Sequence, residues 1–170
     1  MDKFLSRYCK VLEGFMALCL VAMVVLIFGN VVLRYAFNSG ITVSEEVSRW
    51  LFVWLTFLGG VVALHGHGHL GTDVVVGRLG PTGRKACLLV GYLLMLMVCW
   101  LLTRGAFEQA RINWDVSAPS SGASMAWFYL AGVVFGVSAA VVLLNDLFKV
   151  VTGRATEADL TLVKASEDRA

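Results

Sequence analysis

Four long runs of apolar residues, separated by short polar segments, dominate the chain. The first run, GFMALCLVAMVVLIFGNVVL at 14–33, has 20 residues and no charge. A helix rises about 1.5 Å per residue, so a run of this length crosses a hydrocarbon core of roughly 30 Å. The pattern predicts an all-α integral membrane protein with four transmembrane helices, at about 12–36, 47–68, 86–112 and 125–148.

The ends of the runs contain two ambiguities. A basic segment precedes the first run, as in a signal peptide, but the run is too long for one and no small-residue cleavage site follows. The second run, 50–64, has only 15 uncharged residues and reaches span length through Val47 and the neutral segment HGHGHL. A tilted or partly interfacial helix is an alternative there. Trp127 and Tyr129 near the start of the fourth span are typical of interfacial anchors.

The segment between the first two spans predicts a short amphipathic helix lying in the membrane interface and leading into the second span. Thr42 followed by Glu45 fits a capping box that starts this helix. The apolar face would carry Val43, Val47 and Trp50, and the charged residues are Glu45, Glu46 and Arg49. The spacing of Glu45 and Arg49 also allows an ion pair one turn apart. The alternative is a solvated connecting helix whose charges only mark the membrane boundary.

Composition and charge support this assignment. The chain is 58% hydrophobic and 15% charged, against about 45–50% and about 25% in soluble domains. Ten of the 14 Lys and Arg residues lie on the side that holds both termini if there are four spans. The positive-inside rule therefore places both termini in the cytoplasm. We expect one membrane domain at 1–153 and a mobile cytoplasmic tail at 154–170.

Two further groups of residues are candidates for contacts. Arg104, Glu108 and Arg111 recur at spacings of four and three, which places them on one helix face. They either pair with one another at the membrane boundary or form a polar contact face for a partner. Gly132 and Gly136 form a GxxxG pair that permits close helix approach, either within the bundle or with another subunit.

The residues that carry chemistry are sparse. His65 and His69 share a helical spacing of four and could hold a metal, but His67 would point away, the intervening glycines weaken a helix, and only Asp73 is nearby. We expect no metal there, and none at the four cysteines, which form no CxxC. The chain contains no nucleophile elbow, P-loop or dinucleotide fingerprint, and no acid deep within a span. We therefore expect no enzyme activity, no cofactor and no nucleic-acid partner, but an auxiliary subunit of a larger membrane complex.

An ordered set of short motifs gives a family resemblance. LRY-x-F-N ends the first span, EE-x-x-R-x-L-F-x-W-x-x-F-x-G opens the second, and GHL-x-x-D and LGP follow. In order and spacing the chain resembles the small membrane subunit, of the DctQ type, of tripartite ATP-independent periplasmic (TRAP) transporters. The resemblance covers about 14–81 strongly. It implies a helical collar around a large membrane subunit that carries the sodium and substrate sites, with a periplasmic binding protein delivering an organic acid.

The resemblance also suggests where the partners bind. The residues expected at the large-subunit interface are Arg34, Glu45, Glu46 and Arg49 from the motifs, with Gly132 and Gly136 from the packing pattern. Arg104, Glu108 and Arg111 are expected to contact the binding protein because of their periplasmic placement. Two other functions stay open. A self-sufficient four-helix multidrug carrier would need a carboxylate within a span, and a membrane anchor of a redox complex would share haem or quinone ligands with a partner.

Overall fold

The computed structural model describes residues 2–66 and 81–152. In these two ranges the chain forms four helices and no strand: α1 (Asp2–Phe37), α2 (Thr42–His65), α4 (Pro81–Ile112) and α5 (Ala126–Val151). Each helix contains a segment long and apolar enough to cross a membrane. The predicted all-α fold with four membrane-spanning helices is confirmed, whereas the predicted tail at 154–170 lies outside the described residues.

The second helix differs from its prediction. The separate interfacial helix is not present in the described residues, because the segment that begins at Thr42 forms the first turns of α2 itself. No proline interrupts this helix, and its first glycine is Gly59, so helical hydrogen bonding propagates through the predicted boundary. The resulting 24 residues extend over about 36 Å, enough to cross the hydrocarbon core without the residues after His65.

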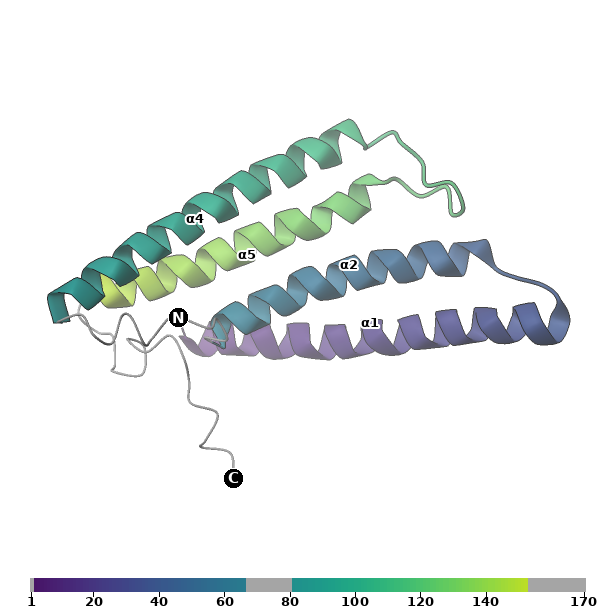
Figure 1. Cartoon of the computed structure of the whole chain (residues 1–170), viewed down its shortest axis with the longest axis horizontal. Helices are drawn as coiled ribbons and strands as arrows, with labels where there is room; N and C mark the ends of the chain where they lie inside the picture. The colour runs from purple at the N-terminus through teal and green to yellow at the C-terminus, as the bar shows by residue number, and fades with distance from the viewer. Residues whose placement is uncertain (1, 67–80, 153–170) are drawn as a thin grey trace, which may run out of the picture.

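The helices form two antiparallel hairpins that lie side by side (Figure 1). Helix α1 packs against α2, α4 packs against α5, and α2 joins the two hairpins by packing against α5. The connections 38–41 and 113–125 lie at one end of the molecule, and the first residues of α1 lie at the other. The order α1, α2, α5, α4 makes α2 and α5 central and leaves α1 and α4 outside.

Two apolar clusters hold this arrangement together. One lies between α4 and α5 and contains Leu88, Tyr92, Cys99, Ala139, Leu143 and Val150. The other, around Leu12, Leu58 and Val61, joins α1 to α2 and extends to Phe135 of α5. The Phe135 ring also lies 5.5 Å from the Phe57 ring, centroid to centroid. Since lipid tails are as apolar as these side chains, shape-complementary packing rather than the hydrophobic effect stabilises such contacts within a membrane.

Large apolar side chains are exposed mainly on the outer helices. Among the described side chains, thirteen such residues are exposed on α1 and nine on α4, but only Phe52 is exposed on α2. Continuous surfaces of this kind are solvated by acyl chains or by other apolar helices. The central helix α5 exposes six such residues in the described part of the chain, so α2 alone differs clearly from the outer helices.

Candidate functional site

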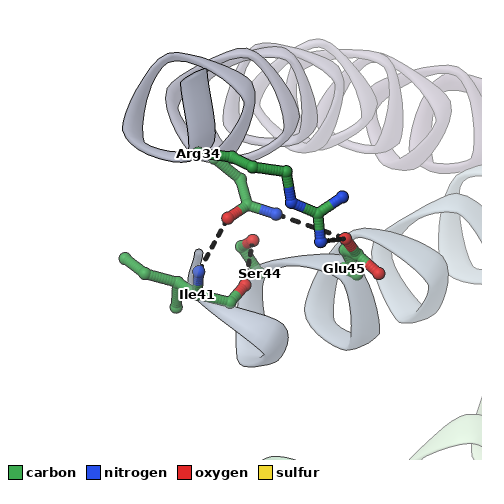
Figure 2. A network of polar contacts seen from close by, with 5 residues as sticks. Arg34, Ile41, Ser44 and Glu45 are labelled. Carbon is green, nitrogen blue, oxygen red and sulfur yellow. Dashed lines mark hydrogen bonds and ion pairs between the residues drawn. The ribbon is translucent and has the colours of Figure 1, made fainter. Parts of the chain in front are cut away.

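A polar network closes the α1–α2 hairpin at its connected end (Figure 2). Asn30 is 93% buried, at 7% exposure, and its Oδ1 accepts a hydrogen bond of 2.7 Å from the backbone N–H of Ile41. Its Nδ2 donates to Oε1 of Glu45 at 3.3 Å. The same carboxylate oxygen lies 3.7 Å from Nη2 of Arg34. One asparagine in α1 thus holds both the entry to α2 and its first acidic side chain.

This network replaces the predicted capping box. Thr42, which was predicted to start a separate interfacial helix, is the first residue of α2. Ile41 is the N-cap, and it makes no capping hydrogen bond through its side chain. The hydroxyl of Ser44 donates instead to the carbonyl oxygen of Ile41 at 2.6 Å. A capping box would have brought an acidic side chain back to the N-cap N–H, and here the amide of Asn30 in the neighbouring helix takes that place.

The tight turn before α2 depends on an asparagine that the motif contains. Asn38 has a φ of 49°, in the left-handed region, which asparagine tolerates better than most residues. The following N–H, of Ser39, donates to the carbonyl oxygen of Leu33 at 3.1 Å and closes the end of α1. The motif LRY-x-F-N therefore includes residues that turn the chain, as well as Arg34, which joins the network.

Glu46 fastens one hairpin to the other. It is 9% exposed, and its carboxylate accepts the backbone N–H groups of Ser120 at 3.0 Å and Ser121 at 3.3 Å. It also accepts the hydroxyl of Ser121. The connection 113–125 is held in part by its own backbone, since Ala118 N–H donates to the Ala123 carbonyl oxygen at 2.7 Å. Glu46 is therefore engaged inside the chain rather than displayed on its surface.

Arg49 has a different environment from the other motif charges. The predicted pair between Glu45 and Arg49 is not formed, because Glu45 turns toward Asn30 and Arg34. Arg49 is exposed and has no ion pair or hydrogen bond to any residue in the described ranges. Of the four motif charges predicted at the large-subunit interface, it alone is free of intrachain bonds in the described part of the molecule.

The GxxxG pair lies inside the α4–α5 hairpin. A Cβ at Gly132 would lie 3.1 Å from the Cβ of Ala106, and one at Gly136 would lie 3.1 Å from the Cβ of Thr103 and 3.3 Å from the carbonyl oxygen of Cys99. Both glycines are buried by α4 of the same chain. The structure thus shows the packing within the bundle that was the alternative for this pair.

The predicted binding-protein residues are exposed at the connected end of α4. Glu108 and Arg111 form an ion pair of 3.1 Å, with side chains 51% and 72% exposed. Arg104 instead places its guanidinium carbon 5.5 Å from the ring centroid of Trp100. The three charges share one region of the helix but only two of them pair, which leaves the positive charge of Arg104 against the aromatic face of Trp100.

Of the three histidines in HGHGH, the structure describes only His65. His65 lies in the last turn of α2, while His67, His69 and Asp73 lie outside the described residues. Among the described residues there is no group of three or more His, Cys, Asp or Glu side chains able to hold a metal ion. The polar contacts of the described residues hold the helices and their connections in position. The site can therefore fix the arrangement of the helices and offer charged side chains to a partner.

Comparison with known proteins gives a consistent set of relatives. The family model described as "Tripartite ATP-independent periplasmic transporters, DctQ component" matches residues 23–153. A TRAP transporter small permease protein, by name, of Haemophilus influenzae is 38% identical over 142 residues, 84% of this chain and 88% of the relative. A second of that name and organism is 34% identical over 140 residues, 82% and 85% of the two chains. The C4-dicarboxylate TRAP transporter small permease protein DctQ of Vibrio cholerae is 32% identical over 95 residues, 52% of this chain and 41% of the relative.

Proposed function

The chain belongs to the DctQ family of TRAP transporter small permease components, and from this premise we propose that it holds the large membrane subunit in the bilayer. The observation that carries the proposal is the family match over residues 23–153, which includes the last part of α1 and all of α2, α4 and α5. As a transporter component the chain is a multi-pass membrane protein and not an enzyme.

The complete transporter would take up an organic acid together with sodium. In this proposal the large subunit carries the substrate and sodium sites, and a periplasmic binding protein delivers the substrate. The name of the Vibrio cholerae relative, which refers to C4-dicarboxylates, supports a substrate that carries carboxylates. In this proposal the small subunit holds the large subunit in place and takes no part in the chemistry of transport. This agrees with the polar groups of the chain, which join its own helices to one another.

The charge distribution supports an orientation in the inner membrane. With ten of 14 Lys and Arg residues on the side of the termini, the positive-inside rule places both termini in the cytoplasm. The connections 38–41 and 113–125 then face the periplasm, at the end of the molecule where both lie (Figure 1). Arg104, Glu108 and Arg111 lead into the second of these connections, and we propose that they help to dock the binding protein.

The predicted large-subunit interface can be narrowed by the geometry. Arg49 is free to pair with the partner, whereas Arg34 and Glu45 pair with each other but remain 62% and 58% exposed. Glu46 would act indirectly, by keeping the 113–125 connection in place. Gly132 and Gly136 are not part of the proposed large-subunit interface, because α4 of the same chain covers both.

The test is purification of the tagged chain from its native membrane in a gentle detergent, with mass spectrometry of the proteins that accompany it. We expect a stoichiometric large polytopic membrane protein encoded beside a periplasmic binding protein. Recovery of the chain alone or as a homodimer, although its neighbours are well expressed, would contradict the proposal and favour a self-sufficient carrier. A Soret absorption band in the purified complex would favour a redox anchor instead.

A further inference from the structure

The exposed residues of α2 form a single stripe. Within Thr42–His65 they are Thr42, Glu45, Arg49, Phe52, Thr56 and Ala63. Their spacings are three, four, three, four and seven residues, so all six lie on one face of the helix. A regular alternation of three and four is the repeat with which one helix packs along another. We call these six residues the α2 stripe.

The composition of the α2 stripe does not suit lipid. It contains one large apolar side chain, Phe52, whereas thirteen are exposed on α1 and nine on α4 in the described part of the chain. The hydroxyl of Thr56 donates to the carbonyl oxygen of Phe52 at 2.8 Å, so this side chain needs no polar partner outside its own helix. Small residues and threonine are enriched where membrane helices meet, because they allow the backbones to approach closely. The stripe therefore has the character of a helix contact, and the outer helices have that of a lipid-facing surface.

The charged residues of the α2 stripe indicate which charge a partner helix should carry. Glu45 is already paired with Arg34, while Arg49 has no ion pair or hydrogen bond in the described ranges. Arg49 lies seven residues, or about 10 Å, from the start of α2, close to the membrane boundary. An arginine at that depth is stable when it reaches the headgroups or pairs with an acid. The stripe thus carries one positive charge available to a partner.

We propose that the α2 stripe packs against a transmembrane helix of the large subunit, and that this helix carries an aspartate or glutamate at the level of Arg49. The inference rests on the proposed function, and it deepens that function by naming the contacting face and the chemistry opposite it. A second copy of this chain in the same orientation suits the stripe less well, because Arg49 would then face its own equivalent.

Site-specific photo-crosslinking tests the contact in the assembled complex. Benzoylphenylalanine is introduced at Phe52 or Thr56 in the stripe, and at Val24 of α1 or Leu94 of α4 as matched exposed controls. We expect adducts with the large subunit from the two stripe positions and lipid adducts from the controls. Large-subunit adducts from the controls only, adducts with a second copy, or lipid adducts from the stripe would each overturn the inference.

A charge reversal tests the chemistry opposite Arg49. We expect Arg49→Glu to reduce the amount of large subunit recovered with the tagged chain by about tenfold or more, because two acids would then face each other. Asp115→Lys reverses an exposed charge at the same end of the molecule and should leave recovery unchanged. Normal recovery with Arg49→Glu would overturn the proposed ion pair. If no large subunit is recovered with the wild-type chain, the proposed function fails. If the large subunit is recovered but crosslinks only to positions outside the α2 stripe, the proposed function stands and only this inference fails.

Discussion

The two hairpins share one topology but are fastened in different ways. At the α1–α2 hairpin the link 38–41 is short, and a polar network around Asn30 closes the connected end. At the α4–α5 hairpin the connection 113–125 is long, and the helices meet at Gly132 and Gly136 against side chains of α4. Besides its apolar cluster, the first hairpin has hydrogen bonds at one end. Besides its own apolar cluster, the second has two glycines, one turn apart, at which its helices approach closely.

The difference determines what each hairpin tolerates. A polar network fails when a donor or acceptor is removed, because the remaining group stays unsatisfied. A close approach of two helices fails when volume is added, because packed interiors have no space to absorb it. The family motifs contribute Arg34 and Glu45 to the first kind of contact, around Asn30, which precedes them, and the glycine pair of α5 supplies the second. Substitutions chosen for each mechanism should therefore affect one hairpin and spare the other.

The largest effect is expected from added volume at the α4–α5 contact. Gly136→Ala places a methyl group against the Thr103 side chain and the Cys99 carbonyl oxygen, and should lower the free energy of unfolding by about 1–3 kcal/mol. Gly91→Ala is the matched control in the same hairpin, since nothing lies within 4 Å of its added Cβ. The control should be neutral or stabilising by up to about 1 kcal/mol. Both values come from SDS titration in detergent micelles, and equal effects of the two variants would show that close approach does not fasten this hairpin.

The contact between Glu46 and the connection 113–125 should weaken when the charge of Glu46 is removed. Glu46→Gln keeps the size of the side chain but gives weaker acceptors to the N–H groups of Ser120 and Ser121. We expect faster hydrogen exchange of these two amides, measured by mass spectrometry or NMR in detergent, with the Ile41 amide unchanged. Unchanged exchange at Ser120 and Ser121 would mean that the connection 113–125 holds itself in place without α2.

Removal of an acceptor should weaken the α1–α2 hairpin more moderately. Asn30→Ala leaves the Ile41 N–H without its partner and should cost about 1–2 kcal/mol. Asn113→Ala removes a partly exposed asparagine whose side chain bonds to Gln109, one turn earlier, and should change stability by less than about 0.5 kcal/mol. The Ile41 amide should also exchange faster in the first variant only. Similar losses in the two variants would contradict a special role for the buried asparagine.

Local patterns in the sequence predicted much of this fold, but not its long-range contacts. Apolar runs predict the four spans, but they begin the second one at 47, after a separate interfacial helix that starts at Thr42, whereas α2 itself begins at Thr42. Asn30 is the only strongly polar side chain in the first apolar run, and that isolation is the available signal for its role. No local pattern could pair Glu46 with serines 74 and 75 residues away. The packing of α2 against α5 likewise depends on shape complementarity between distant helices, which periodicity in one helix does not encode.

The smallest effect on stability is expected at the exposed ion pair of α4. Glu108 and Arg111 are 51% and 72% exposed, so Glu108→Gln or Arg111→Gln should each change the free energy of unfolding by only about 0–1 kcal/mol. Neither hairpin should be disturbed, because the pair lies within one helix and fastens nothing to it. If these residues dock the binding protein, the same variants should weaken its association with the complex, most visibly at low salt, where exposed charges are screened least. Full stability with weakened association would separate a docking charge from the fastening charges of α2, whereas full stability with unchanged association would remove the pair from the proposed docking surface.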